Sequence, residues 1–232
     1  MQRTVLITGA SRGLGRAAAV VFLERGWRVG INYVNSHSAA RELLSYPGSE
    51  LFPGDISSRE AVNEIFRNLK NKFGCLDAVI NSAGISKDRL LVNTTPEEWN
   101  RVISVNLTGV FNICRQALRI MRPAGGHIIN ISSLAAVTGR RGQCAYTASK
   151  AGVIGFSRSL ARQAAGVNIR VNVVLPGYMD TAMVNKVILA RARRENILGR
   201  INEPGEIARF IYQLVSASSI SGQVFNLDSR IT

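Results

Sequence analysis

Short apolar runs rich in valine and isoleucine alternate along the whole chain with longer segments of helical periodicity. The early runs, such as "TVLIT" and "DAVIN", are almost continuously apolar and lack the polar–apolar alternation of half-exposed strands. Strands of this kind are buried on both faces and belong to parallel sheets that helices cover. The β-α-β-α order therefore predicts an α/β protein, a doubly wound parallel sheet with helices on both faces.

The periodicity also predicts the positions of the elements, and no linker, repeat or low-complexity segment divides them. We therefore expect a single domain over residues 1–232, with ligands bound where the strands end. Strands are expected at Arg3–Thr8, Arg28–Tyr33, Leu51–Phe52, Leu76–Asn81, His127–Ser132, Ile169–Leu175 and Gln223–Leu227. Helices are expected at Gly13–Arg25, Ser38–Ser45, Ser58–Phe73, Pro96–Met121, Tyr146–Ala164 and Pro204–Val215.

A glycine-rich stretch, "TGASRGLG", links the first predicted strand to the first predicted helix. Glycines let the backbone come close to a ligand, and the N–H groups of the helix start can receive a pyrophosphate. The stretch therefore indicates dinucleotide binding rather than a merely tight turn. Its candidate residues for binding the cofactor are Gly9, Ser11, Arg12, Gly13, Leu14 and Gly15.

The end of the second strand bears on the choice between NAD and NADP. An acidic residue there would bind the ribose hydroxyls and repel a 2′-phosphate, but "GINYVNS" contains no acid. The guanidinium of Arg12 can bind a phosphate, although it could also simply face solvent. Both features favour NADPH as the cofactor, with Asn32 as a further candidate contact.

Two later strand ends supply more candidates. Asp55 in "GDIS" is placed to accept a hydrogen bond from an adenine amino group, and Ile56 follows it. The small residues of "NSAG" would let the cofactor lie against the backbone, which makes candidates of Asn81, Ala83 and Gly84. Either segment by itself would be an ordinary turn after a strand.

Ser133, Tyr146 and Lys150 form the candidate catalytic set. Tyr146 and Lys150 are four residues apart and share one helix face, and Ser133 follows the fifth strand. A nearby ammonium stabilises tyrosinate and lowers the tyrosine pKa, so that the phenol can give a proton to a carbonyl oxygen. Ser133 could hydrogen-bond the same oxygen. In isolation, a tyrosine and a lysine at this spacing are usually two ordinary surface residues. The other motifs of the chain are what favour a catalytic role.

Taken together, these motifs resemble those of a classical short-chain dehydrogenase/reductase over essentially the whole chain. "TGASRGLG", "NSAG", "NLTG", Ser133, "YTASK" and "PG" occur in the order and at the spacing of that family. Within it, "SAGISKDRLL" and "GQCAYTASKAGVIGFSRSLA" look most like 3-oxoacyl-[acyl-carrier-protein] reductases of the FabG type. The resemblance implies a Rossmann-like NAD(P)-binding reductase domain and an enzyme that reduces 3-oxoacyl thioesters with NADPH.

The resemblance also implies a role for each matching residue. Tyr146 would be the general acid, Lys150 would bind the nicotinamide ribose, and Ser133 would orient the substrate carbonyl. Asn106 would hold a water that links Lys150 to solvent, and Thr181 would contact the nicotinamide carboxamide. The remaining cofactor contacts implied are Pro176 and Gly177. No metal is expected, because the three cysteines are too widely spaced to suggest a cluster or a disulfide framework.

The formal net charge of +14 indicates an anionic partner or a generic basic surface. The segment "NKVILARARRENILGR", which covers the substrate in the family, carries Arg191, Arg193 and Arg194. We interpret it as a flexible basic lid that steers an acidic acyl carrier protein or the phosphates of coenzyme A. The resemblance further implies fatty acid biosynthesis as the place of this enzyme in lipid metabolism.

The C-terminus departs from the family pattern. Relatives commonly end in Asp-Gly-Gly, whereas this chain has "DSRIT", with Ser229 and Arg230 in place of the glycines. We expect the homotetramer of relatives, in which Arg230 could reach the site of a neighbouring subunit. No export signal or membrane-spanning run is evident, so we expect a cytoplasmic protein without a membrane partner.

Two other functions stay open on the sequence alone. One is an NADP-dependent reductase or dehydrogenase of another ketone or alcohol, such as a polyketide, sugar, steroid or quinone. The other is a non-catalytic protein that senses the cofactor or binds nucleic acid on the same fold, which the net charge permits. We do not favour nucleic acid as a partner, because a binding module would not require the Ser–Tyr–Lys set.

Overall fold

The structure is a computed structural model that describes residues 2–121, 125–181 and 186–230, without the side chains of 186–188. Strands in the described ranges form one seven-stranded sheet in the order β3-β2-β1-β4-β5-β6-β7, in which every pair is parallel. The order reverses at β1, which confirms the predicted doubly wound, Rossmann-like α/β fold. The strands are β1 (Thr4–Thr8), β2 (Arg28–Tyr33), β3 (Ser49–Pro53), β4 (Ala78–Asn81), β5 (Gly126–Ile131), β6 (Ile169–Leu175) and β7 (Val224–Asn226).

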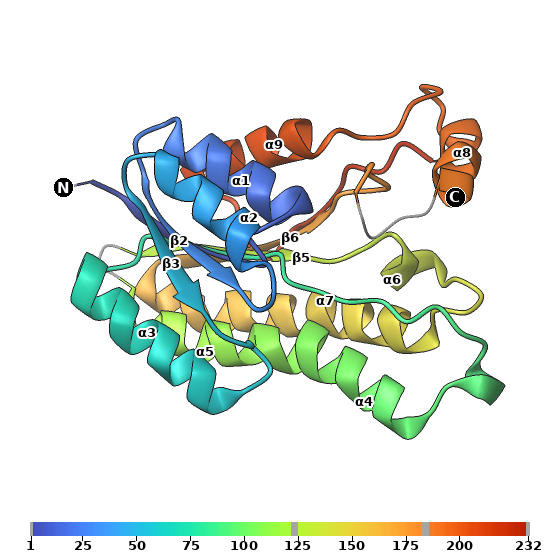
Figure 1. Cartoon of the computed structure of the whole chain (residues 1–232), viewed down its shortest axis with the longest axis horizontal. Coiled ribbons are helices and arrows are strands. Elements are labelled where there is room, and N and C mark those ends of the chain that lie inside the picture. Colours follow the sequence, from blue (N-terminus) through green and yellow to red (C-terminus); the bar gives the residue numbers. More distant parts are fainter. Residues whose placement is uncertain (1, 122–124, 182–185, 231–232) are drawn as a thin grey trace.

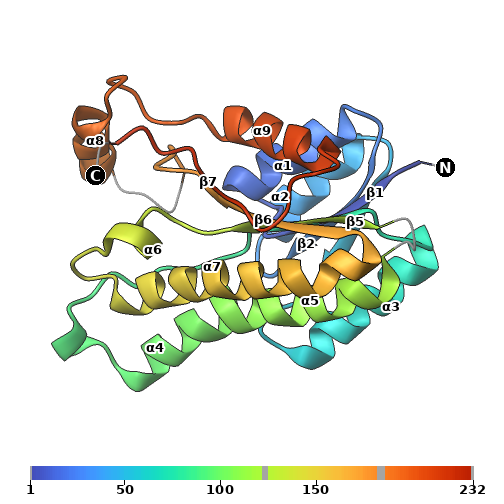
Figure 2. The same cartoon turned by 180° about the vertical axis from the view of Figure 1, so that it is seen from behind.

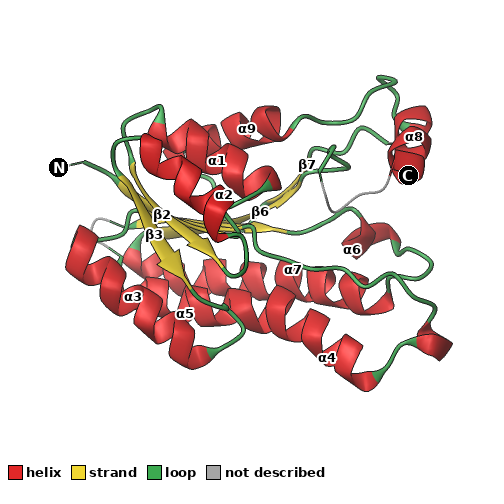
Figure 3. Ribbon diagram, in the orientation of Figure 1, coloured by secondary structure: helices red, strands yellow, loops and turns green. Residues whose placement is uncertain are grey.

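Helices cover both faces of this sheet, as the continuously apolar strands predicted (Figure 1). All five residues of β1 are buried, and Val5 and Ile7 pack in one core whereas Leu6 packs in the other. Successive side chains of a strand point to opposite faces, so an unbroken apolar run fills both cores. One face carries α1 (Gly13–Leu23), α2 (His37–Arg41) and α9 (Pro204–Ser216), and the other carries α3 (Arg59–Phe73), α5 (Gly109–Ile120) and α7 (Cys144–Ala164) (Figures 2 and 3).

Local capping fixes the start of two helices. The Ser58 hydroxyl accepts a hydrogen bond from the backbone N–H of Ala61 at the start of α3. Helix α4 (Pro96–Ile103) begins with a reciprocal capping box between Thr95 and Glu98, with Pro96 in its first turn. Each cap satisfies N–H groups that have no partner inside the helix.

The predicted single helix over Pro96–Met121 is wrong in its middle. A π-helical segment, Ser104–Thr108, separates α4 from α5, and within it the Asn106 side chain hydrogen-bonds to the backbone of Ile85. Helix α7 begins at Cys144, two residues before the predicted start. The short elements are η1 (Glu42–Ser45), η2 (Leu91–Asn93), α6 (Ala135–Thr138) and η4 (Ala165–Val167).

The predicted flexible lid contains a helix, α8 (Lys186–Glu195). Leu189 and Ala192, three residues apart, are both buried and hold one face of this helix against the protein. The C-terminal tail follows β7 and pairs with the residues after α8, since the Ile197 N–H donates to the carbonyl of Ser229. Tail and helix thus lie together at the end of the molecule opposite the N-terminus (Figures 1 and 2).

Candidate active site

A cavity of about 1590 Å³ opens where the strands end and reaches from the glycine loop to Tyr146 and Lys150. Most of the residues predicted to bind the cofactor or act on the substrate line it. The predicted residues that line the cavity are Gly9, Ser11, Arg12, Gly13, Leu14, Gly15, Asn32, Asp55, Ile56, Ala83, Gly84, Ser133, Tyr146, Lys150, Pro176, Gly177, Thr181 and Arg191. The predicted residues outside its lining are Asn81, Asn106, Arg193 and Arg194.

The glycine loop forms a cradle that side chains would fill. A Cβ on Gly9 would lie 2.8 Å from the Cα of Ala83, and one on Gly15 would lie 2.4 Å from the carbonyl oxygen of Gly9. The Thr8 hydroxyl accepts hydrogen bonds from the N–H groups of Ser82 and Ala83, at 3.1 Å each, and fixes the two strand ends together. The first turn of α1 faces this cradle without an acidic side chain, so the loop fits a pyrophosphate.

The end of β2 bears no acidic group. Asn32, a candidate cofactor contact, lies at this strand end in the lining of the cavity. Its side chain is buried, and its amide donates to the carbonyls of Phe52 and Gly54, at 3.0 Å each. These hydrogen bonds therefore connect β2 to the end of β3 and use the amide group of Asn32. Arg12, by contrast, is exposed at the cavity margin, where a phosphate could reach it.

Asp55 is held in place by Ser57 and Arg101, which the sequence interpretation did not pair with it. Its carboxylate accepts hydrogen bonds from the N–H and hydroxyl of Ser57 and from Arg101 of α4, at 2.7–2.9 Å. Burial acts to raise the pKa of Asp55, but these hydrogen bonds and the Arg101 charge lower it overall. Arg101 was missed because nothing in its local pattern distinguishes it from other exposed helix arginines.

Asn81 lies below the cavity rather than in its wall. Its amide donates to the Asn130 side chain at 2.8 Å and contacts the sulfur of Cys114, in a buried polar cluster between β4, β5 and α5. Alternate strand residues point to opposite faces, and this register turns Asn81 inward. The backbone of the "NSAG" segment nevertheless reaches the cavity through Ser82, Ala83 and Gly84.

Ser133, Tyr146 and Lys150 meet at one end of the cavity. The Ser133 side chain lies close enough to the Tyr146 hydroxyl to lower its pKa by hydrogen bonding. The Lys150 ammonium donates to the Ile131 carbonyl at 2.8 Å and lies 5.9 Å from the centroid of the Tyr146 ring. Helix α7 supplies the tyrosine and the lysine one turn apart, and the end of β5 supplies the serine.

The pKa directions of this set refine the expected chemistry. Burial raises the pKa of Tyr146, the Ser133 hydrogen bond lowers it, and the charge of Asp88 raises it further, with a net rise. Burial alone lowers the pKa of Lys150 to about 8. The expected lowering of the tyrosine pKa is therefore wrong for this structure. A raised pKa keeps the phenol protonated at neutral pH, which is the form that donates a proton.

Asn106 is fully buried behind this set. Its side chain accepts from the Ile85 N–H at 2.9 Å and donates to the Ile85 carbonyl at 2.9 Å and to the Ser149 hydroxyl at 3.0 Å. A Cβ on Gly84 would lie 3.3 Å from Oδ1 of Asn106 and 3.4 Å from Nζ of Lys150. The absence of a side chain at Gly84 thus leaves the space between these two groups open.

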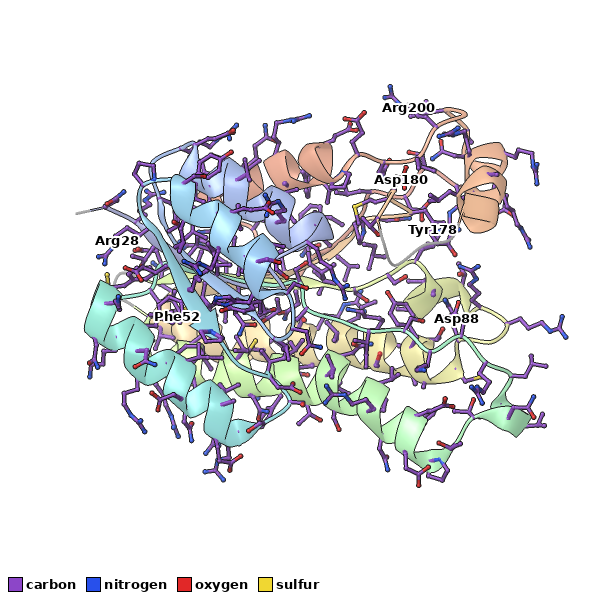
Figure 4. All side chains as sticks on the ribbon, viewed as in Figure 1. Arg28, Phe52, Asp88, Tyr178, Asp180 and Arg200 are labelled. Atoms are coloured by element: carbon purple, nitrogen blue, oxygen red, sulfur yellow. The ribbon has the colours of Figure 1, made fainter. Side chains whose placement is uncertain are left out.

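Asp88 and Gln143 form a contact that the sequence interpretation missed. The Gln143 amide, three residues before Tyr146, donates to both carboxylate oxygens of Asp88 at 2.8 and 2.9 Å. The pair joins the segment after β4 to the start of α7 (Figure 4 labels Asp88). In the sequence, Gln143 stands out only as part of "GQ" before the tyrosine. This dipeptide does not by itself predict a contact with Asp88.

Charged groups gather at the end of the cavity beside α8. Tyr178 follows β6, and guanidinium groups of Arg140 and Arg230 lie over its ring (Figure 4 labels Tyr178). Arg230 pairs with Asp228 in its own chain. Arg193 and Arg194 are exposed on α8 and face away from the cavity lining, because Leu189 and Ala192 occupy its inner face.

The fold and the cavity define a class of protein, the oxidoreductases that use a nicotinamide cofactor. A family model described as Enoyl-(Acyl carrier protein) reductase matches residues 9–230. The chain belongs to the short-chain dehydrogenase/reductase family, as its motifs indicated. No helix in the described ranges is both long and apolar enough to cross a membrane.

Three relatives with different names are similar to this chain over nearly their full lengths. A 3-oxoacyl-[acyl-carrier-protein] reductase FabG from Thermotoga maritima is 38% identical, over 99% of this chain and 97% of the relative. An acetoacetyl-CoA reductase from Shinella zoogloeoides is 38% identical over 97% of each chain. A carbonyl reductase family member 4 from Danio rerio is 38% identical over 100% of this chain and 98% of the relative. The chain is therefore an oxidoreductase that reduces a ketone.

Proposed function

We propose that this enzyme reduces 3-oxoacyl thioesters, bound to acyl carrier protein or coenzyme A, to 3-hydroxyacyl thioesters with NADPH. The observation that carries the proposal is Tyr146, protonated at neutral pH, close to Ser133 and adjacent to Lys150 in one cavity. Two of the relatives described above have names that specify 3-oxoacyl or acetoacetyl thioesters. Residues 1–232 would form one domain, and four copies a homotetramer.

Each residue of the set has a defined task in this mechanism. The nicotinamide supplies a hydride to the 3-carbonyl carbon when it is bound. Tyr146 donates its proton to the carbonyl oxygen, and Ser133 hydrogen-bonds that oxygen as negative charge develops. Lys150 would hold the nicotinamide ribose and resupply the proton, with a water next to Asn106 as the link to solvent. Thr181 and the Pro176–Gly177 turn would hold the nicotinamide end.

Replacing Arg12 with glutamine is expected to raise the KM for NADPH about tenfold and to leave the KM for NADH unchanged. The guanidinium is exposed at the cavity margin and would contact the 2′-phosphate, and a charge-assisted hydrogen bond of this kind is worth about 1.5–3 kcal/mol. Steady-state kinetics with both cofactors measures the effect. Equal changes for NADPH and NADH would show that Arg12 does not recognise the 2′-phosphate.

Neutralising Arg191, Arg193 and Arg194 together is expected to lower the turnover of a carrier-bound substrate most strongly at low ionic strength. These cations would attract an acidic carrier over a distance, and salt screens such attraction. The measurement is kcat/KM across a series of salt concentrations, with a small thioester as the uncharged control. Unchanged kcat/KM for the carrier-bound substrate at every salt concentration would contradict electrostatic steering by α8.

The experiment that tests the proposal is an NADPH-oxidation assay with one short 3-oxoacyl group presented in three forms. The forms are the thioester of acyl carrier protein, of coenzyme A and of a minimal thiol, each repeated with NADH. The name of the Danio rerio relative favours a second candidate, a carbonyl compound without a thioester. A quinone or simple ketone is therefore included, and turnover of it alone would favour that candidate.

A further inference from the structure

A cluster at the catalytic end of the cavity has no task in the mechanism above. The Cζ atoms of Arg140 and Arg230 lie 5.2 and 4.3 Å from the centroid of the Tyr178 ring. The three residues come from the loop before α7, the tail and the segment after β6, and all line the cavity. Three separate segments thus bring two cations and a phenol hydroxyl to one place.

Arg230 is a fixed member of this cluster. Its side chain is 17% exposed and pairs with Asp228, which is 2% exposed, through Nε at 2.8 Å and through Nη2. The tail itself is tied to the residues after α8 by the hydrogen bond from Ile197 to Ser229. Within the described residues, the N–H groups on Nη1 of Arg230 have no hydrogen-bond partner, so they remain available to a ligand.

Arg140 adds a further positive charge to the cluster, and this charge acts on Glu195 together with those of Arg191 and Arg230. Arg230 forms a salt bridge with Asp228, and Arg191 forms one with Glu195. The charges lie near one another, because Arg191 first, and then Arg230 and Arg140, lower the pKa of Glu195. The cluster therefore keeps an excess of positive charge beside the cavity.

The position of the cluster excludes the cofactor's own 2′-phosphate as its ligand. Arg140 lies between Ser133 and Tyr146 in the chain, and Tyr178 directly follows Gly177, so both belong to the catalytic end. Arg12, the residue assigned to the 2′-phosphate, belongs to the glycine loop, which forms a different part of the cavity lining. Two guanidinium groups and a phenol hydroxyl supply several donors, which suits a phosphate with its several acceptor oxygens.

We propose that Arg140, Tyr178 and Arg230 form a phosphate-binding subsite for the substrate's phosphopantetheine arm. The inference rests on the proposed function, since acyl carrier protein and coenzyme A both present the acyl group on this arm. Arg140 binds the phosphate through its charge, and Arg230 and Tyr178 form the rigid wall against which it lies. The subsite selects thioesters that carry a phosphate over those that do not.

The test compares 4′-phosphopantetheine with pantetheine, which differ only in the phosphate, by calorimetry on the protein saturated with NADP+. The wild type is expected to bind the phosphorylated compound at least about tenfold more tightly. Arg140→Gln is expected to reduce this preference to about twofold or less. Arg59→Gln, an exposed arginine outside the cavity, is the matched control and keeps the wild-type preference.

An unchanged preference in Arg140→Gln, or no preference in the wild type, would overturn the subsite. Arg230→Gln, checked by thermal melting for an intact fold, is expected to weaken the preference as well. Kinetics separates this inference from the proposed function. If no thioester is reduced but binding still depends on Arg140, the proposed function fails and the phosphate subsite stands. Competition by intact acyl carrier protein or by coenzyme A then shows which source of the phosphate is bound.

Discussion

Replacing Tyr146 with phenylalanine is expected to lower kcat by about 10²–10⁴-fold and to leave the Kd for NADPH unchanged. The variant removes only the hydroxyl that lies close to Ser133, while the ring keeps its place near Lys150. Without that hydroxyl, the group assigned to donate directly to the carbonyl oxygen is missing. Single-turnover NADPH oxidation measures the chemical step, and fluorescence titration measures cofactor binding.

The matched control for this variant is Tyr46→Phe. Tyr46 is a partly buried tyrosine against the α1 side of the sheet, outside the cavity, so its hydroxyl should not affect turnover. Loss of activity in both variants would indicate a general effect on the fold. Full activity in Tyr146→Phe would remove the tyrosine from the mechanism.

Replacing Lys150 with methionine is expected to lower kcat by about 10²-fold or more and to raise the Tm by about 5 °C at pH 7. Lys150 is buried, its ammonium donates to the Ile131 carbonyl, and burial is the cause of its low pKa. A buried ammonium without a carboxylate destabilises the folded state, and a methionine of similar length does not. Activity and stability should therefore change in opposite directions.

The gain in stability should depend on pH in a defined direction. The pKa of Lys150 is about 8 in the folded protein and 10.5 for an ordinary lysine. Between these values the unfolded chain binds the proton and the folded protein does not, so wild-type stability rises with pH. Below pH 8 both states are protonated and the full penalty persists. The Tm advantage of Lys150→Met should thus be largest at pH 7 and smaller at pH 9.5.

Thermal melts at the two pH values measure this difference, with Lys70→Met as the control. Lys70 is exposed on α3 and should show no such pH-dependent advantage. A lower Tm in Lys150→Met at pH 7, or a Tm advantage that grows toward pH 9.5, would show that burial of the Lys150 charge does not destabilise the folded protein.

Features set by local pattern were predictable from the sequence. The apolar run of β1 predicted burial on both faces, and the spacing of Tyr146 and Lys150 predicted a shared helix face, because both depend on near neighbours in the chain. The π segment around Asn106 was not predictable, since its sequence continues the helical pattern. Within this segment Asn106 accepts a hydrogen bond from Ile85, 21 residues away, which only the folded chain brings into reach.

Contacts of charged side chains across the cavity could not be predicted from the sequence either. Arg101 reaches Asp55 over 46 positions, and Gln143 reaches Asp88 over 55, and neither pair has a local signature. The basic segment 185–200 was interpreted from charge alone, which does not reveal that Leu189 and Ala192 anchor α8 and turn Arg193 and Arg194 outward. Composition indicated that cations gather near the site but did not show which of them face it.

The tail closes one side of the cavity. The described chain ends at Arg230, within the wall that faces the substrate, whereas its beginning lies at the far end of the sheet (Figure 1). Any change to the chain that displaces Arg230 is therefore expected to alter this wall of the cavity.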